Sequence, residues 1–479
     1  MSINYTELFK MCGLDEEWQA ANKERLDKFL YQIFIRTQED VEASIEWTKK
    51  QYNTESAGVR KLLSVMMKEC IDYCLARDEY EIIINYARPT MCTLSQCLHV
   101  AEKRINKELG YNKYYARGTS IVDVMIIMGT VFNKSNWMCE LAEEMGQTAG
   151  KGHCSEYQIW EGGLSKGMIP VPDVELGCGI FCDQAPEVEL MMAEEFGFDM
   201  VFTDMPEDHK WDSWPSMDPE ATKFISENTE MAYDYLAEKY GFKMTEDDKN
   251  QGALEATQLF TSYFRIAGLL GQTDGLPISR ADLSLAFIQF IVGGVYQNEL
   301  LEGFKMLEKE IRGNIRKGNW VCPPGSPKVF ATMTPIADLR FFHEAEDCGL
   351  NICNLWFEYL PEAGLTAPYT SEIPKEQMYE MIYRFNGLGD LCGSQLRLVE
   401  DAIKHLNLDG VIIFTCMFCR PLCLPANMTK DYIGKQYPEI PTILMELDAY
   451  DSRNYTPEQY RTRLESFAEI IRMNKEMSA

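Results

Sequence analysis

The sequence predicts an α/β protein with two doubly wound parallel-sheet domains, a helical N-terminal region and a helical connecting segment. Short apolar runs rich in β-branched residues alternate with helical patterns in two parts of the chain, residues 121–204 and 328–472. Several of these runs are apolar throughout, which is typical of strands covered by helices on both faces. Short links between successive strands and helices indicate a parallel sheet in each part.

The N-terminal part of the chain, residues 1–117, is expected to be mostly helical. Its segments 16–34 and 41–52 space their apolar residues three and four positions apart, with charged residues between them. The first sheet is expected after this region, with strands predicted at residues 121–129, 174–181 and 199–204. Helices are predicted at residues 139–146, where Gly146 ends the helix, and 187–196.

A second helical region connects the first sheet to the second. A linker with the sequence WVCPPGSP, residues 320–327, is of the kind that ends a domain. Strands are then predicted at residues 328–333, 350–357, 411–414 and 442–447, and helices at 336–348, 397–406 and 457–472. The predicted regions are therefore 1–117 (helical), 118–218 (first α/β domain), 219–320 (helical connection) and 321–479 (second α/β domain). Both sheets are expected to be flavodoxin-like or Rossmann-like.

The overall charge and hydropathy exclude several classes of partner. The formal net charge of the chain is −28 at pH 7, whereas nucleic-acid backbones and anionic membranes require a basic surface. Its apolar runs fall far short of the roughly 20 residues that span a bilayer. No basic stretch followed by an apolar one opens the sequence, so a secretory signal is not expected. We expect a cytoplasmic protein that binds neither nucleic acid nor membrane.

The cysteines are the residues most indicative of chemistry. The chain has 16 cysteines and only five histidines, and no histidine pairs with cysteine in a zinc-finger spacing. Clustered cysteines in a large cytosolic protein are more often metal ligands or redox groups than disulfides. A sulfur-dominated shell favours an iron–sulfur cluster or a tetrathiolate zinc site. The alternative is that these cysteines are ordinary buried apolar residues.

Two cysteine groups lie next to predicted strand ends, and a further cysteine precedes one of them in the chain. Cys416, Cys419 and Cys423 follow the strand predicted at 411–414. In the first sheet domain, Cys178 and Cys182 end another predicted strand, and Cys154 lies 28 residues before Cys182. Ligands of open α/β sheets bind at the carboxyl ends of the strands. If the strand ends of the two domains face each other, Cys154, Cys182 and Cys419 could converge on one cluster.

Four blocks of the sequence resemble a known family, the large subunit of the 2-hydroxyacyl-CoA dehydratases of the 2-hydroxyglutaryl-CoA type, and the related benzoyl-CoA reductase subunits. The blocks lie between residue 121 and the C-terminus, at 137–146, 168–206, 349–354 together with 409–421, and 448–467. The last block, DAYDSRNYTPEQYRTRLESF, is the most specific, because it is similar to the closing signature of the family.

The resemblance implies an α/β enzyme subunit that forms a dimer with a sister subunit or with itself. It implies a 4Fe–4S cluster held by Cys154, Cys182 and Cys419. A separate ATP-dependent iron–sulfur activator would deliver one electron to a 2-hydroxyacyl-CoA thioester. The resulting ketyl radical then expels the hydroxyl group, so that water is eliminated. In a related branch with a double-cubane 8Fe–9S cluster, the additional ligands would be Cys178, Cys353 and Cys392.

The sequence also suggests polar residues around the cluster. Glu140 is the candidate for the carboxylate that handles the proton, and the alternative is that it only complements the helix dipole. Ser135 is the candidate for a hydrogen bond to the thioester oxygen. Arg453, Arg461 and Arg463 either hold the anionic CoA or, as we favour, brace the C-terminal helix.

Two other functions compete with the dehydratase hypothesis. A benzoyl-CoA-type or double-cubane reductase subunit would use the electron to reduce its substrate, as in ring reduction, instead of expelling a hydroxyl group. A non-catalytic partner subunit would hold a structural metal or an inert cluster. Glu140 and Ser135, which lie beside the cysteines of the first sheet domain, favour the catalytic hypothesis over a non-catalytic partner subunit.

Overall fold

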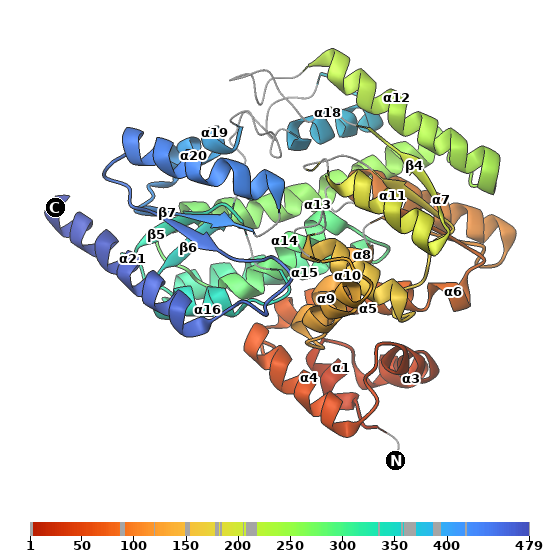
Figure 1. The fold of residues 1–479 in the computed structure, drawn as a ribbon, viewed down its shortest axis with the longest axis horizontal. Helices are drawn as coiled ribbons and strands as arrows, with labels where there is room; N and C mark the ends of the chain where they lie inside the picture. The colour runs from red at the N-terminus through yellow and green to blue at the C-terminus, as the bar shows by residue number, and fades with distance from the viewer. Residues whose placement is uncertain are drawn as a thin grey trace.

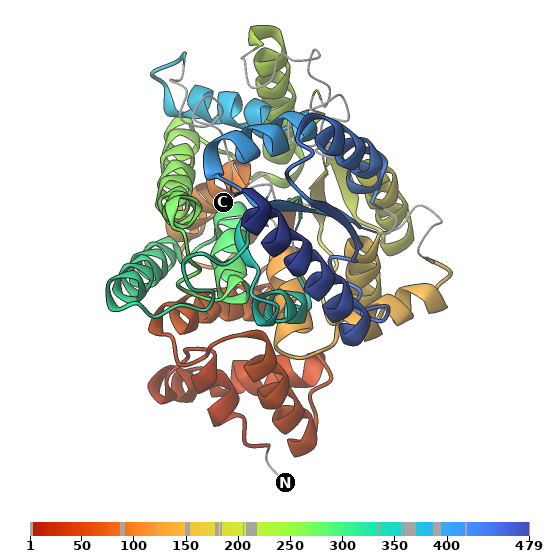
Figure 2. The same cartoon turned by 90° about the vertical axis from the view of Figure 1, so that its left-hand side faces the viewer.

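The computed structural model describes most of the chain. The described residues are 3–86, 92–118, 120–148, 154–177, 182, 184–204, 206, 218–333, 336–355, 358, 370–386, 394–416 and 419–478. Two parallel four-stranded sheets with helices around them form its framework (Figures 1 and 2). The predicted fold class, an α/β protein with two parallel-sheet domains, is confirmed.

The first helices of the chain lie at one end of the molecule, at the bottom of Figure 1, and the later helices of the N-terminal region lie above them. They are α1 (Thr6–Met11), α2 (Glu16–Ala21), α3 (Lys23–Gln32), α4 (Gln38–Gln51), α5 (Ala57–Cys74) and α6 (Ala76–Glu79). Helix α5 is buried along most of its length, because it packs against α8 and α15 from later parts of the chain. The N-terminal region is therefore part of the common core.

The first sheet has the order β2-β1-β3-β4. Its strands are β1 (Ile82–Tyr86), β2 (Tyr114–Gly118), β3 (Val174–Gly177) and β4 (Asp199–Phe202). The helices between them are α7 (Cys92–Leu109), α8 (Ser120–Thr130), α9 (Ser135–Glu144), α10 (Ser155–Ser165) and α11 (Gln184–Phe196). Helix α7 packs against β2, and α11 packs against the edge strand β4.

Two expectations for this part of the chain are wrong. Residues 121–129, predicted as a strand, form helix α8. The apolar residues of α8 are buried all round, so its sequence shows no polar face from which a helical period could be recognised. The expectation that residues 1–117 are mostly helical missed β1 and β2, both of which lie inside the first sheet. Strand β4 is also less buried than its apolar sequence indicates.

The connecting segment is helical, as expected. It contains α12 (Pro219–Tyr235), the π-helical turn η2 (Leu236–Tyr240), α13 (Glu246–Gln272), α14 (Arg280–Val292) and α15 (Gln297–Lys317). Helix α13 packs against α7 on the first sheet and against β6 on the second. It lies in the centre of Figure 1, between the two sheets, and therefore joins them into one body.

The second sheet has the order β6-β5-β7-β8, so both sheets arrange their strands in the same way. Its strands are β5 (Lys328–Ala331), β6 (Asn351–Leu355), β7 (Gly410–Thr415) and β8 (Thr442–Glu446). The helices are α16 (Arg340–Asp347), α18 (Pro374–Asn386), α19 (Ser394–Leu406), α20 (Arg420–Gln436) and α21 (Pro457–Ser478). Figure 1 shows α19 and α20 on one side of this sheet and α16 and α21 on the other.

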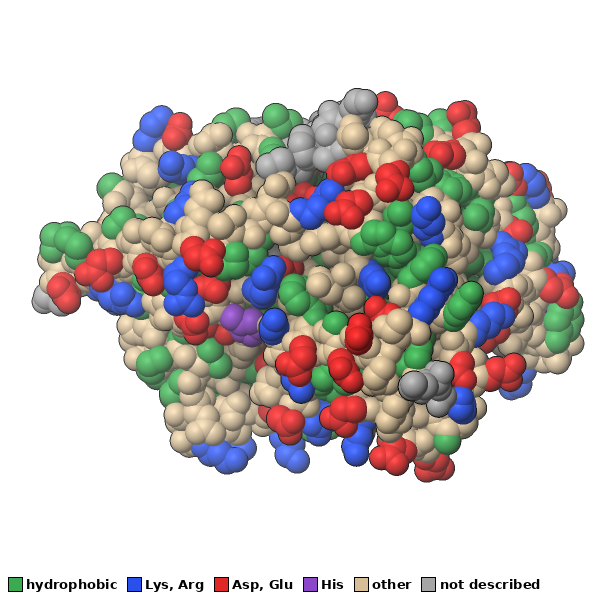
Figure 3. Space-filling model, turned by 60° about the horizontal axis from the view of Figure 1, so that its bottom comes forward, with side chains coloured by type: hydrophobic (Ala, Val, Ile, Leu, Met, Phe, Trp, Pro, Cys, Tyr) green, Lys and Arg blue, Asp and Glu red, His purple; other side chains and the backbone are tan. Residues whose placement is uncertain are grey.

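The surface agrees with the composition of the chain. On the face drawn in Figure 3, acidic and basic side chains are interspersed. Among the described residues, none of the helices combines the length and the hydropathy that crossing a bilayer would require.

Candidate functional site

Cysteines follow the third strand of each sheet in equivalent positions. Cys182 comes after β3, which ends at Gly177, and Cys419 comes after β7, which ends at Thr415. In each sheet the strand order reverses between the first and third strands, and ligands of doubly wound folds bind at the carboxyl ends of strands at such a point. The sequence predicted the strand ends, and the structure adds that the two positions correspond.

The Cys419 loop is a tight turn between β7 and α20. Cys419 is the N-cap residue of α20, and its amide donates to the Cys416 carbonyl at 3.0 Å. The Cys423 thiol also donates to this carbonyl, at 2.7 Å. A hydrogen bond with Cys419 and burial raise the pKa of the Cys416 thiol, and burial raises that of Cys423.

Cys154 and Cys182 precede helices as well. Cys154 is the N-cap residue of α10, and Cys182 lies two residues before Gln184, where α11 begins. The positive end of a helix dipole favours a negative group, including a thiolate. All three predicted ligands therefore occupy positions where a thiolate is electrostatically favoured.

Exposure separates these cysteines from most of the others. Among the cysteines whose burial is described, Cys154, Cys182, Cys419 and Cys423 are partly exposed, and the rest are buried. Reactive and metal-binding cysteines are typically accessible, whereas buried structural cysteines are inert. Accessible cysteine sulfur is the type of donor that an iron–sulfur cluster requires.

Of the additional ligands of the double-cubane alternative, the structure describes only Cys353. Cys353 lies within β6 with 1% of its surface exposed, and burial raises its pKa to about 11. Cys178 and Cys392 lie outside the described residues. The described residues include Cys154, Cys182 and Cys419, and no three His, Cys, Asp or Glu side chains among them are arranged as a metal site, so the structure does not bring the three predicted ligands together as one.

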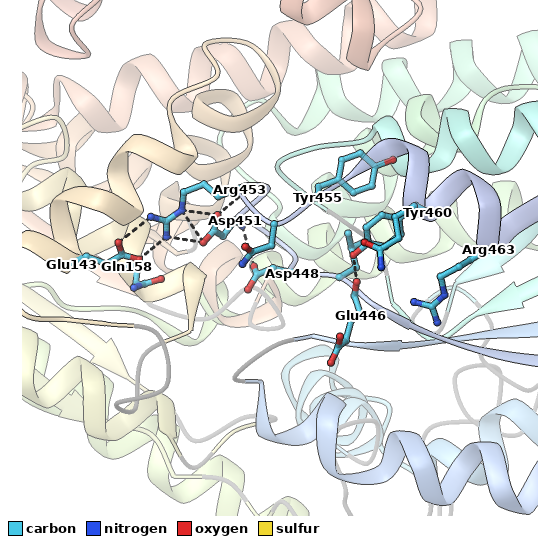
Figure 4. A pocket seen from close by; sticks show the side chains of 12 residues that line it. Glu143, Gln158, Glu446, Asp448, Asp451, Arg453, Tyr455, Tyr460 and Arg463 are labelled. Carbon is cyan, nitrogen blue, oxygen red and sulfur yellow. Dashed lines mark hydrogen bonds and ion pairs between the residues drawn. The ribbon is translucent and has the colours of Figure 1, made fainter.

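A pocket of about 240 Å³ opens where the two halves of the molecule meet (Figure 4). It is lined by α9, α10, the end of β8, the following loop and the start of α21. The lining residues are Glu143, Gln158, Glu446, Leu447, Asp448, Asp451, Arg453, Asn454, Tyr455, Gln459, Tyr460 and Arg463. Four carboxylates and two guanidinium groups make the pocket acidic, which does not suit the phosphates of CoA.

Asp448 is the central polar group between the halves. It accepts a short hydrogen bond from the Ser155 hydroxyl on α10 and bonds from the amides of Tyr450 and Asp451, at 2.9 and 3.0 Å. Burial raises its pKa. Because Ser155 follows Cys154, and Asp448 follows the strand paired with β7, this bond connects the two cysteine loops.

Two lining residues present polar atoms that the described residues leave unpaired. The amide nitrogen of Gln158 donates to the Gln147 carbonyl at 2.9 Å, but its buried Oε1 has no hydrogen-bond partner among the described residues. The buried Tyr455 hydroxyl likewise has no partner in that part of the chain. Buried polar atoms are usually hydrogen-bonded, so these two atoms are exceptions beside the pocket.

The predicted catalytic residues lie on α9. Glu140 is the sixth residue of this helix, not near its start as expected, and its side chain is exposed. It does not line the pocket, whereas Glu143, three positions along the helix, does. Ser135 is the first residue of α9 and is 3% exposed. Their catalytic roles remain predictions.

The three arginines make bracing contacts. Arg453 pairs with Glu143 and Asp451. Arg461 pairs with Glu344 and Asp347 from α16 and its C-terminal end, while Arg463 donates to the Leu444 carbonyl in β8. These contacts agree with the bracing role that the sequence favoured.

Sequence reasoning missed Asp448, Glu143 and Ser155. Asp448 opens the most specific block of the family resemblance, so a signal for it existed. Ser155 carried no such signal, because its partner is 293 residues away.

Comparison with known proteins identifies the family. The family model of the 2-hydroxyglutaryl-CoA dehydratase D-component matches residues 121–471. The chain is 23% identical over 325 residues to the alpha subunit of (R)-2-hydroxyglutaryl-CoA dehydratase from Acidaminococcus fermentans, a match that covers 64% of this chain and 62% of that subunit. It is 22% identical over 353 residues to the (R)-phenyllactyl-CoA dehydratase alpha subunit of Clostridium sporogenes, covering 71% of this chain and 81% of that subunit. The chain belongs to the 2-hydroxyglutaryl-CoA dehydratase D-component family, a family of dehydratases.

Proposed function

We propose that this chain is the iron–sulfur subunit of a radical 2-hydroxyacyl-CoA dehydratase. In this proposal Cys154, Cys182 and Cys419 hold a 4Fe–4S cluster, and water is eliminated from a 2-hydroxyacyl-CoA. The observation that carries the proposal is the position of these cysteines. All three are partly exposed, two cap helices and the third lies two residues before one, and Cys182 and Cys419 follow equivalent strands of the two sheets.

The chemistry requires both a cofactor and a shaped protein environment. When bound, the cluster would supply one low-potential electron to the thioester. The added electron makes acidic the proton on the carbon next to the one that loses its hydroxyl group. The protein supplies three thiolates, stabilised by helix N-termini. Glu140 is the proposed proton-handling carboxylate, and Ser135 the proposed donor to the thioester oxygen.

The proposed partners are inferred from the relatives that the chain resembles. Both are named alpha subunits, which supports a sister subunit or a second copy of this chain as the partner. The electron would come from a separate ATP-dependent iron–sulfur activator. Because the pocket is acidic, we expect the CoA phosphates to bind outside it.

Anaerobic purification tests this proposal. About four irons and four sulfides per chain are expected if a single 4Fe–4S cluster is bound, with the corresponding Mössbauer and EPR spectra. Cys419→Ser should abolish the cluster. The matched variant Cys423→Ser, four residues away in the same loop, should retain it. A tightly bound zinc ion in place of iron, or full iron content in Cys419→Ser, would refute the ligand assignment.

A further inference from the structure

The first turn of α10 is attached on both sides to elements that carry the other cysteines. Cys154 is its N-cap, and Ser155 and Tyr157 are its first and third residues. Both are buried, with 4% and 2% of their surfaces exposed. Their hydroxyl groups donate to carboxylates on different parts of the chain.

On one side, Ser155 donates to Asp448, which lies directly after β8 and Leu447. The amide of Leu447 donates to the carbonyl of Thr415, the last residue of β7, at 3.0 Å. Cys416 follows at once, and its carbonyl is the acceptor for the Cys419 amide. Three hydrogen bonds, joined by the backbone between neighbouring residues, therefore connect the residue after Cys154 to the loop that holds Cys419.

On the other side, Tyr157 donates to Glu189 at 2.5 Å. Glu189 lies in α11, the helix that begins two residues after Cys182. Its carboxylate packs against Gly177, the last residue of β3, where a Cβ atom would lie 2.5 Å from Glu189 Oε2. This bond therefore attaches α10 to both ends of the segment that contains Cys182.

A further contact joins the neighbouring helix α9 to the loop after β8 without involving a cysteine loop. The amide nitrogen of Asn136 on α9 donates to the Ser452 hydroxyl at 3.0 Å, and the Ser452 amide donates to Asn136 Oδ1 at 2.9 Å. Ser452 lies four residues after Asp448, in the same loop. It therefore offers a matched serine for comparison with Ser155.

We propose that Ser155 and Tyr157 are positioning residues that set Cys154 at its distance from Cys419 and from Cys182, respectively. This inference rests on the proposed function, in which three thiols must approach one another to hold one cluster. Groups behind the ligands of a metal site orient those ligands, and their loss typically weakens metal affinity by about tenfold to a hundredfold.

Thiol cross-linking of the iron-free chain tests the positions directly. Dibromobimane, which joins two nearby thiols, should link Cys154 to Cys419 and Cys154 to Cys182, as identified by peptide mapping. Ser155→Ala should lose the first link and keep the second, and Tyr157→Phe should do the reverse. Ser452→Ala should keep both. The retained link in each variant shows that the chain is folded, and thermal unfolding should give similar midpoints for Ser155→Ala and Ser452→Ala.

Iron retention gives the second measurement. After anaerobic reconstitution, Ser155→Ala and Tyr157→Phe should lose iron to a chelator about tenfold or more faster than the parent and Ser452→Ala. Cross-links unchanged by both substitutions, or absent from the parent chain, would overturn the inference. A parent chain that shows the selective cross-links but takes up no iron would refute the cluster proposal while supporting the positioning roles.

Discussion

Arg453, on the loop after β8, is paired with Glu143 on α9, with 2.6 Å between Nη2 and Oε1. The same guanidinium group also contacts Asp451, at 2.8 Å. These hydrogen bonds raise the pKa of Arg453. Together with the Ser155–Asp448 bond, the Arg453–Glu143 pair attaches the loop after β8 to the first half of the molecule.

Removing this ion pair should destabilise the protein only modestly. The side chains of Arg453 and Glu143 are 27% and 34% exposed, so solvent screens their attraction. Arg453→Met should lower the free energy of unfolding by about 1 kcal/mol or less. Urea unfolding at low and high ionic strength would measure it, and the difference from the parent should shrink at high salt. A loss that is independent of salt would indicate that the aliphatic part of the side chain, not its charge, is stabilising.

Helices α9 and α10 should not tolerate a side chain at their closest approach. A Cβ atom on Gly162 of α10 would lie 2.0 Å from the carbonyl oxygen of Met138 on α9. Gly162→Ala should therefore cost about 1–3 kcal/mol of stability. Gly268→Ala, in α13 with no atom within 4 Å of its Cβ, should instead stabilise by about 0.4–1 kcal/mol. Chemical denaturation of both variants checks this, and changes of the same sign would contradict it.

Stability should decrease as the pH rises through the titration of Asp282. Burial raises the pKa of this carboxyl group from 3.8 to about 7, and its carboxylate accepts the Asn53 amide at 2.8 Å. Between these values the folded state binds a proton that the unfolded state has released, so raising the pH favours unfolding. Asp282→Asn keeps an acceptor for Asn53 and should flatten this dependence between about pH 4 and pH 7, as measured by urea unfolding. Identical pH profiles for variant and parent would exclude Asp282 as the cause.

Glu140 should affect turnover without affecting the fold. Its side chain is exposed on α9, so Glu140→Gln should leave the melting temperature and the iron content unchanged. If it handles the proton, turnover of a 2-hydroxyacyl-CoA by the assembled enzyme should be lost. Glu143→Gln is the control on the same helix, since it weakens the pair with Arg453 but retains the Glu140 carboxylate. Unchanged turnover in Glu140→Gln would remove this residue from the mechanism.

Several elements could be predicted because their sequence patterns are local. The apolar runs of β7 and β8, and the turn residues before β7, placed these strands to within a residue or two. The same reasoning placed Cys419 and Cys182 after strand ends. The prediction failed for β2, where Arg117 is buried among Glu69, Asp72 and Glu102. A charged residue paired inside the core conceals a buried strand from any reading of hydropathy.

The sequence by itself determined the alternation of strands and helices, the absence of a strongly basic composition, and the family to which the closing block belongs. Only the tertiary structure decided that residues 121–129 are a helix, because a segment buried on all sides has no periodic polar face. Only the tertiary structure shows that Ser155 contacts Asp448. Their contact depends on the packing of two sheets far apart in the chain, and no local preference of either residue encodes it.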